Sequence, residues 1–372
     1  MEFGNEVLKI IEGGLDKNKD KVKSYSRLLI EKLNEKGETR YAERIKRALA
    51  DKSAHPVYMD EFLSKPTDQD SQMDMVDIFL PTAKDKIELV LSDVTKQKLA
   101  NYVGTIQNRS KLNELGIELS EALLLYGPPG CGKTSIAQLI AQELNLPLVV
   151  ARLDSMVSSL LGSTAKNIRR IFDYAKERPC ILFLDEFDAI AKARTDENEV
   201  GELKRVVNSL LQNIDSFAEN NILICATNHE KLLDEAVWRR FSVTIEVPRP
   251  NEDMRIQLIR LYLENMKYTF KDDSKALRKA AKALADLAPS DIRTICYNTI
   301  KSAVVSKKEY LDYIDFLYEL YLFKNYKEDQ VTPTIFLYNN GARQNDIARL
   351  LSISLRQVRN NLSSNGESKN GE

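Results

Sequence analysis

The sequence has few of the residues that build disulfide frameworks and zinc sites. Its 372 residues include only two histidines, His55 and His229. Its four cysteines are Cys131, Cys180, Cys225 and Cys296. No Cys-x-x-Cys pair occurs, so neither a disulfide framework nor a zinc site is indicated. No uncharged apolar run approaches the roughly 18 residues of a membrane span, and the first residues lack the features of a secretory signal. We therefore expect a cytoplasmic protein.

The chain also lacks a net charge that would draw it to a polyanion. Lys and Arg total 54 and Asp and Glu total 55, which gives a formal charge of −1 at pH 7. Any binding to nucleic acid or to a membrane surface must then come from a local patch. The composition, 43% apolar and 29% charged, is that of an ordinary globular protein. The length allows about two or three domains.

Residues 1–52 predict a small helical hairpin or three-helix bundle. Apolar residues three or four positions apart, among them Tyr25, Leu29 and Leu33, mark one face of an amphipathic helix. This unit is either a docking module for a partner or a stabilising cap. Residues 53–85 predict an acidic linker, because their first 28 residues hold six acidic residues and one lysine.

Residues 86–250 alternate between short apolar runs and amphipathic helical patterns. Five runs predict strands: 122–126, 148–153, 181–185, 222–227 and 243–247. Near-continuous apolar strands separated by helices indicate a parallel sheet that is covered on both faces, which places the chain in the α/β class. Residues 251–328 show only helical periodicity and predict a helical subdomain.

The segment directly after the first apolar run carries the strongest motif. It reads GPPGCGKT and fits the phosphate-loop pattern GxxxxGK[ST] between a strand and a helix. Backbone N–H groups of such a loop form an anion-binding nest at the positive end of a helix dipole. Lys133 is expected to reach the β- and γ-phosphates of ATP, and Thr134 to hold Mg²⁺. A plain glycine turn is the alternative. The expected nucleotide-binding residues are Gly127, Pro128, Pro129, Gly130, Cys131, Gly132, Lys133, Thr134, Ser135 and Asp185.

Two adjacent carboxylates end the run 181–185. Asp185 and Glu186 begin 52 residues beyond Lys133. Carboxylates at the end of a buried strand are costly unless a cation or hydrogen-bond donors face them. We expect Asp185 to bind the magnesium ion and Glu186 to polarise the attacking water as a general base. The alternative is a strand end with solvated acids.

An amide and two arginines follow these carboxylates. Asn228 ends the run 222–227, where an amide can orient a lytic water without adding charge. Arg239 and Arg240 begin eleven residues later. A guanidinium supplied across a subunit interface stabilises charge that develops in phosphoryl transfer. The alternative is a pair of solvated arginines at a helix end.

In type, order and spacing, these motifs resemble those of the AAA+ ATPases, and in particular of the classical AAA clade. The resemblance covers about residues 86–310. It implies a P-loop NTPase fold with five parallel strands flanked by helices, and a helical lid. It also implies a homo-oligomeric, hexameric ring that binds ATP with Mg²⁺. By motif it assigns Lys133 and Thr134 to Walker A, Asp185 and Glu186 to Walker B, Asn228 to sensor 1, and Arg239 with Arg240 to the arginine fingers.

Two segments depart from the family pattern. The lid segment APSDIR begins with Ala288, where the clade has a glycine near the adenine. Residues 158–167 resemble the first pore loop, in which an aromatic residue grips a translocated chain. Leu160 takes that place here and Leu161 follows it. Leucine offers less contact area than Tyr or Phe. An ordinary loop before a helix is the alternative.

Residues 330–362 predict a small unit that resembles a helix-turn-helix, and residues 363–372 a disordered tail. Ala348, Ser352 and Val358 stand where the motif needs a small residue, a tight turn and an apolar contact. Four arginines and one aspartate give this unit a local charge of +3. Its partner is either DNA or a protein. The candidate DNA contacts are Ser354, Arg356, Gln357, Arg359 and Asn360.

The sequence thus predicts an ATP hydrolase that remodels or unfolds a protein partner, working as a ring. Two alternatives stay open. One is a DNA-associated AAA+ ATPase that uses its C-terminal helices, and the other is a nucleotide-dependent switch or scaffold with low turnover. Glu186 and the arginine pair favour turnover over the switch. No membrane partner is expected.

Overall fold

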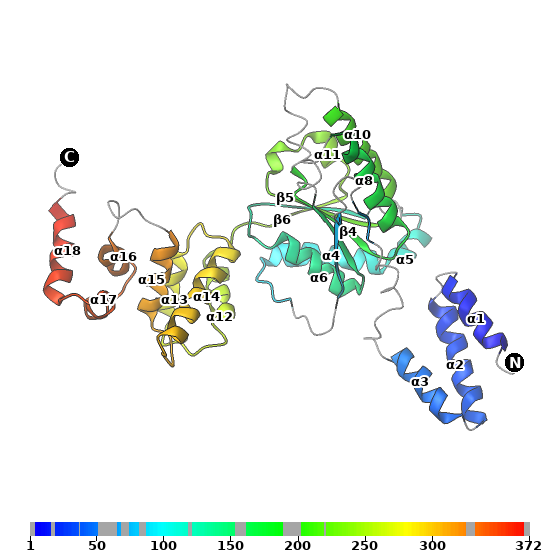
Figure 1. Ribbon diagram of the computed structural model, residues 1–372, viewed down its shortest axis with the longest axis horizontal. Coiled ribbons are helices and arrows are strands. Elements are labelled where there is room, and N and C mark those ends of the chain that lie inside the picture. The colour runs from blue at the N-terminus through cyan, green and yellow to red at the C-terminus, as the bar shows by residue number, and fades with distance from the viewer. Residues whose placement is uncertain are drawn as a thin grey trace. The chain divides into compact units, whose positions relative to one another are not determined.

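The computed structural model describes residues 4–15, 19–36, 38–50, 65–67, 74–81, 87–117, 121–152, 161–188, 202–218, 221–324 and 332–367. The chain divides into two units, and Figure 1 shows its course. The first unit comprises Met1–Ser64 and Thr82–Lys84, and the second comprises Lys65–Pro81 and Asp85–Glu372. None of the helices in the described ranges is both long enough and apolar enough to cross a membrane.

The described residues of the first unit form three helices. They are α1 (Gly4–Leu15), α2 (Lys19–Glu35) and α3 (Thr39–Ala50). Their common core is small and centres on Leu29, Leu33 and Ala42. Because each helix turns one apolar face inward, the three bury that face against one another.

A six-stranded sheet forms the centre of the second unit. Its strands are β1 (Val76–Phe79), β2 (Ala122–Tyr126), β3 (Leu148–Arg152), β4 (Ile181–Asp185), β5 (Ile222–Thr227) and β6 (Val243–Glu246). Their order across the sheet is β1-β3-β4-β5-β2-β6. Strands β2 to β6 pair in parallel, whereas β1 pairs antiparallel with β3. The predicted α/β fold with a parallel sheet is therefore confirmed.

Strand β1 corrects the number of strands. The resemblance implies five, and the sixth lies in residues 53–85, for which the sequence predicts a linker. At this sheet edge Val76 is buried while Asp77 faces outward. The strand has four residues and carries an acid at its second position, so it lacks the apolar run that marks the other five.

Helices cover both faces of the sheet. The helices of this part of the chain are α4 (Asp93–Gln107), α5 (Arg109–Glu114), α6 (Lys133–Leu144), α8 (Leu161–Lys176), α10 (Glu202–Ala218), the 3₁₀ helix η2 (Glu230–Leu232) and α11 (Glu235–Trp238). In Figure 1, α4 and α6 lie on one side of the strands, and α8 and α10 on the other. Alternate strand residues such as Leu125, Phe183 and Ile224 share one core with α4 and α6. Because both faces are covered, every residue of β5 is apolar or buried.

The remaining helices form the lid and the C-terminal part. They are α12 (Glu252–Tyr262), α13 (Ser274–Ala283), α14 (Pro289–Val305), α15 (Tyr313–Lys324), α16 (Pro333–Asn339), α17 (Gln344–Leu351) and α18 (Leu355–Glu367). Side chains cap α12 and α13: Asn251 accepts from the N–H of Met254 at α12, and Asp273 accepts from two N–H groups at α13. These caps satisfy donors that a helix start leaves open.

The lid and the C-terminal helices share one hydrophobic core. It runs from Leu258 to Val358, and it includes a contact between the rings of Tyr321 and Phe336, whose centroids are 5.5 Å apart. The sequence predicts separate units at 251–328 and 330–362, but burial of Phe336 against α15 joins them. Helix α18 also extends to Glu367, into the predicted disordered tail.

Because this core is continuous, removing a side chain from α16 should destabilise the lid as well. We expect Phe336→Ala to lower the free energy of unfolding by about 3 kcal/mol and to reduce amide-exchange protection in both α15 and α16. Exposed Tyr338→Ala, on the same helix, is the matched control and should change stability by less than about 0.5 kcal/mol. Loss of protection confined to residues 332–367 would mean that the C-terminal helices fold separately.

Candidate functional site

The loop between β2 and α6 is built on close backbone approaches. Gly127 has a φ of 140°, and a Cβ placed on it would lie 2.4 Å from the carbonyl oxygen of Val247. Gly130 has a φ of 73°, and a Cβ there would lie 2.2 Å from Oγ of Ser290. Only glycine meets both conditions without displacement. The loop ends at Gly132, where α6 begins without a side-chain cap, so the first N–H groups of α6 are available to an anion.

Lys133 is buried at the start of α6. Its Nζ donates to the carbonyl oxygens of Gly127, at 2.7 Å, and of Pro128, at 2.9 Å. Burial lowers the pKa of this ammonium group, and the nearby carboxylates, Asp185 among them, act in the opposite direction. An anion bound in the loop would therefore stabilise the charged form of Lys133. The neighbouring thiol of Cys131 has a pKa raised by burial, so it acts as a small packing residue rather than a nucleophile.

The end of β4 faces the start of α6. Oγ1 of Thr134 donates to Oδ2 of Asp185 at 3.0 Å, and the backbone N–H of Glu186 donates to Oδ1 of Asp185 at 2.9 Å. Glu186 has a φ of 54°, a left-handed conformation that costs free energy in a residue other than glycine. The surrounding structure holds the backbone there, and this fixes the direction in which the Glu186 side chain leaves the strand end.

Asp188 joins the ends of two neighbouring strands, and sequence reasoning missed it. Its Oδ1 accepts hydrogen bonds from Oγ1 of Thr227, at 3.1 Å, and from the backbone N–H of Asn228, at 3.2 Å. The residue is buried, and Asn228 directly follows β5. A third carboxylate close behind Asp185 and Glu186 is the sequence signal that would have suggested a role.

A cavity of about 310 Å³ gathers most of the predicted residues. Its wall includes Lys133, Thr134, Asp185, Glu186 and Asn228, together with loop residues from Pro129 onward. Gly127 and Pro128 do not line it; their carbonyl groups hold Lys133 instead. Sequence reasoning also missed six wall residues that only the fold brings here: Glu88, Leu89, Val90, Leu91, Leu258 and Tyr262.

The lid closes the cavity by direct contact with the loop. The backbone N–H of Ser290 donates to the carbonyl oxygen of Gly130 at 3.2 Å. Ala288 is buried in the same core as Cys131 and the sheet, and its N–H donates to Oδ2 of Asp291 at 2.9 Å, which caps α14. The alanine that replaces the family's glycine therefore supplies a packing contact between lid and sheet.

The two predicted finger arginines do not reach the cavity of their own chain. Arg239 is exposed and pairs with Glu235 on the same short helix. Arg240 pairs with Asp215 of α10, with Nε 3.1 Å from Oδ1, and also donates to the carbonyl oxygen of Ala236. Neither arginine lines the cavity wall.

The other predicted contacts lie away from this cavity. Leu160 lies outside the described residues, and Leu161 begins α8 with a side chain that the structure does not describe. In the C-terminal part, Ser352 turns the chain between α17 and α18 with a φ of 55°. The five candidate DNA contacts are all exposed: Ser354, Arg356, Gln357, Arg359 and Asn360.

Two of these five side chains are already occupied with each other. Oγ of Ser354 accepts from the N–H of Gln357 at 3.2 Å, and Oε1 of Gln357 accepts from the N–H of Ser354 at 2.8 Å. This reciprocal pair caps the start of α18. Arg359 donates from Nε to Oε1 of Gln344 at 3.4 Å.

Comparison with known proteins matches the part of the chain that forms most of this cavity to a family. Residues 123–249 match the family described as ATPase family associated with various cellular activities (AAA). An AAA family ATPase of Sinorhizobium fredii, itself described as uncharacterized, is 38% identical over 229 residues, which are 62% of this chain and 68% of that protein.

Proteasome-activating nucleotidases of archaea are also similar. The protein of Methanococcus maripaludis is 34% identical over 218 residues, 57% of this chain and 53% of its own length. Proteasome-activating nucleotidase 1 of Haloferax volcanii is 36% identical over 190 residues, 49% of this chain and 46% of its own. The chain thus spans about half the length of these nucleotidases.

The close contact at Gly130 should make it far less tolerant of a side chain than a comparable glycine. Gly116 has nearly the same φ, 74°, but nothing lies within 4 Å of a Cβ placed there. We expect Gly116→Ala to cost about 1–2 kcal/mol in the free energy of unfolding, measured by chemical denaturation. Gly130→Ala should cost clearly more, and adding Ser290→Ala should recover part of the difference. Equal costs at the two glycines would contradict the proposed contact between lid and loop.

Proposed function

The chain belongs to the AAA family of ATPases and hydrolyses ATP, and on that basis we propose that it couples hydrolysis to remodelling or unfolding of a protein partner, as a ring oligomer. The observation that carries the proposal is the direct contact between the lid and the phosphate loop. Ser290 on α14 bonds Gly130 of the loop directly. A change in what the loop binds then acts on the lid without any intermediate element.

The loop and its neighbours fit a nucleotide with magnesium. Backbone N–H groups at the start of α6 and the ammonium of Lys133 are the groups that bind phosphates, and Lys133 would leave its two carbonyl acceptors to do so. Oγ1 of Thr134 and Oδ2 of Asp185 form a pair of hard oxygen donors 3.0 Å apart, which suits Mg²⁺. Bound magnesium neutralises charge on the phosphate oxygens. Leu89, Val90 and Leu91, with Leu258 and Tyr262 of the lid, offer the apolar wall that a base needs.

Glu186 and Asn228 act on the attacking water in this proposal. Glu186 accepts a proton from the water, and the amide of Asn228 orients it. Two hydrogen bonds fix their backbones, one from the Glu186 N–H to Asp185 and one from the Asn228 N–H to Asp188. Both side chains thus depart from the adjacent ends of β4 and β5 with little freedom of direction.

Arg239 and Arg240 serve a neighbouring subunit in this proposal. They lie off their own cavity, and Arg239 is exposed. A guanidinium presented to a neighbour's γ-phosphate stabilises charge in phosphoryl transfer. Each active site would then need two subunits, which ties hydrolysis to ring assembly.

A protein is the partner that the relatives favour. The names of the archaeal relatives state that they activate proteasomes. The three-helix unit α1–α3 is separate from the ATPase unit and would dock the partner or an adaptor. The four cysteines are free and buried, which suits a reducing cytoplasm.

Binding and hydrolysis of ATP should separate by mutation. Lys133→Ala should lose nucleotide affinity, because a buried charge that faces the phosphates is removed. Glu186→Gln should bind ATP normally and lose turnover, because only proton acceptance is removed. Fluorescent-nucleotide binding and steady-state phosphate release measure the two properties. Hydrolysis by Glu186→Gln at the wild-type rate would rule out Glu186 as the base.

Activity should also depend on assembly. Arg239→Ala/Arg240→Ala should lose on the order of 10³-fold in turnover while it still binds ATP. Mixing this double variant with Lys133→Ala should restore some hydrolysis, because a mixed interface pairs an intact cavity with intact arginines. The control is Lys231→Ala, which removes an exposed cation eight residues before Arg239. It should not change turnover. Full activity in a strictly monomeric sample would contradict the trans arrangement.

A further inference from the structure

Helix α13 of the lid presents a face that is entirely basic. Its sequence, SKALRKAAKA, contains four cations and no acid. The buried side of the helix is formed by Leu277, Ala280 and Ala281. All four cations are exposed and lie at positions i, i+3, i+4 and i+7 of the helix: Lys275, Arg278, Lys279 and Lys282. This spacing places them on one face, within about 10.5 Å along the helix axis.

These four cationic side chains are available to a partner. Within the residues that the structure describes, none of the four side chains forms an ion pair or a hydrogen bond with another group. An exposed row of like charges costs free energy in the isolated protein. A chain whose net charge is −1 has many acids that could have balanced such a row, yet none lies on α13.

The basic face continues into a cleft of about 560 Å³ beside the C-terminal helices. Lys275 and Lys279 line it from α13, and Arg343 lines it from the residue before α17. The side chain of Lys279 lies across Gly341, where a Cβ would come within 2.8 Å of Nζ. Helix α17 begins at the cleft without a side-chain cap, so its first N–H groups are open at the same place.

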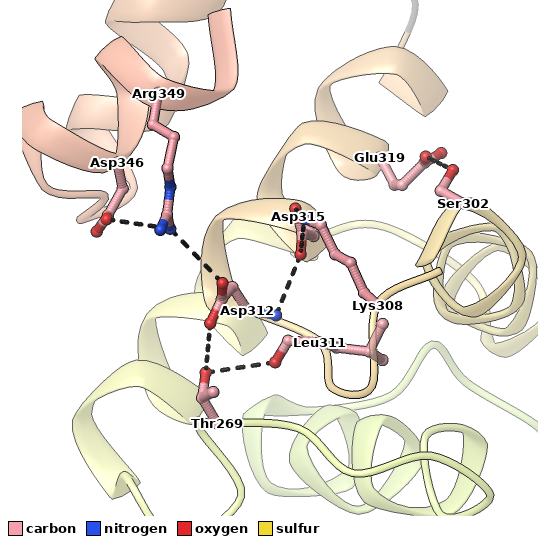
Figure 2. A network of polar contacts seen from close by, with 9 residues as sticks. All are labelled: Thr269, Ser302, Lys308, Leu311, Asp312, Asp315, Glu319, Asp346 and Arg349. Carbon is pink, nitrogen blue, oxygen red and sulfur yellow. Dashed lines mark hydrogen bonds and ion pairs between the residues drawn. The ribbon is translucent and has the colours of Figure 1, made fainter. Parts of the chain in front are cut away.

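Three acids also line the cleft, and each already has a partner. Asp273 accepts from the N–H groups of Lys275 and Ala276 at the start of α13. Figure 2 shows Arg349 between the other two, with Nη2 3.6 Å from Oδ2 of Asp312 and 3.5 Å from Oδ1 of Asp346. The cations at Lys275, Lys279 and Arg343 therefore remain available.

The same contacts fix α13 and the C-terminal helices as one surface. The ion pair between Arg349 and Asp312 connects α17 to the lid (Figure 2). Tyr313 donates from its hydroxyl group to the carbonyl oxygen of Asn340 at 2.9 Å, and the hydrophobic core is shared. The basic helix and α17–α18 therefore present themselves together to a partner.

We propose that this surface binds the backbone of duplex DNA. The row of cations on α13 is complementary to the regular charge of a phosphate backbone. An open helix start preceded by arginine is the kind of group that contacts phosphates in helix-turn-helix proteins, whose first helix crosses the backbone. Because Ser354 and Gln357 cap α18 through each other, they are poorly placed to read bases. Binding is therefore largely independent of sequence.

The test measures binding of a fluorescent random-sequence duplex to the full-length protein by anisotropy, between about 50 and 200 mM salt. The test variant carries Lys275→Gln, Arg278→Gln, Lys279→Gln and Lys282→Gln. The matched control removes four exposed lysines on α4, α5 and α8: Lys98→Gln, Lys111→Gln, Lys166→Gln and Lys176→Gln. We expect the test variant to bind on the order of tenfold or more weakly at low salt and its salt slope to fall by about three to four. The control should bind like wild type.

Three results would overturn the proposal: no binding of duplex by the wild type at low salt, equal binding by the test variant, or equal weakening in the control. Stronger binding of polyglutamate than of duplex would assign the surface to an acidic protein and would also overturn it. ATP hydrolysis without DNA is measured on the same samples. Because α13 does not line the nucleotide cavity, failure of DNA binding with hydrolysis intact leaves the proposed function untouched.

Discussion

The structure depends on the contact between the phosphate loop and the start of lid helix α14. At Gly130 a Cβ would lie 2.2 Å from Oγ of Ser290, and the N–H of Ser290 donates to the carbonyl oxygen of Gly130. Ala288, two residues before Ser290, packs into the core of the sheet. Three requirements meet at this point: a left-handed backbone at Gly130, an exposed carbonyl group, and a small residue before α14. The lid and the loop are therefore in direct contact at this point.

The charged side chains at the strand ends and at the start of α6 are each held by hydrogen bonds within the protein. Lys133 is buried, and its pKa is lowered by that burial; the two carbonyl groups that hold it offset part of the cost. Asp185 is engaged by Thr134 and by the backbone of Glu186, and Asp188 by Thr227 and the backbone of Asn228. Each of these three charged groups thus has protein partners that hold the site in place before any ligand arrives. Such preorganisation favours charge that develops later, at the phosphates.

Much of the fold and site follows from local patterns. The phosphate loop could be predicted because GPPGCGKT between a strand and a helix has few other uses. The five parallel strands could be predicted because they are short, largely apolar runs separated by helical patterns. Strand β1 could not be predicted in this way, because Asp77 faces outward at the sheet edge and interrupts the apolar run. The core shared by Phe336 and α15, and the cavity wall at Tyr262, depend on contacts between distant segments. The row of basic residues on α13 can be seen in the sequence. That Arg343 lines the same cleft follows only from the fold.

The central claim is that the loop, the ends of β4 and β5, and the lid form one ATP site. The most direct measurement is a structure of the assembled protein with a non-hydrolysable ATP analogue and Mg²⁺. The account predicts that the phosphates lie in the loop, that Lys133 turns from its two carbonyl groups toward them, and that the metal lies between Thr134 and Asp185. It also predicts Arg239 or Arg240 of a neighbouring subunit at the γ-phosphate. A nucleotide bound away from α14, or Lys133 still bonded to Gly127, would contradict it.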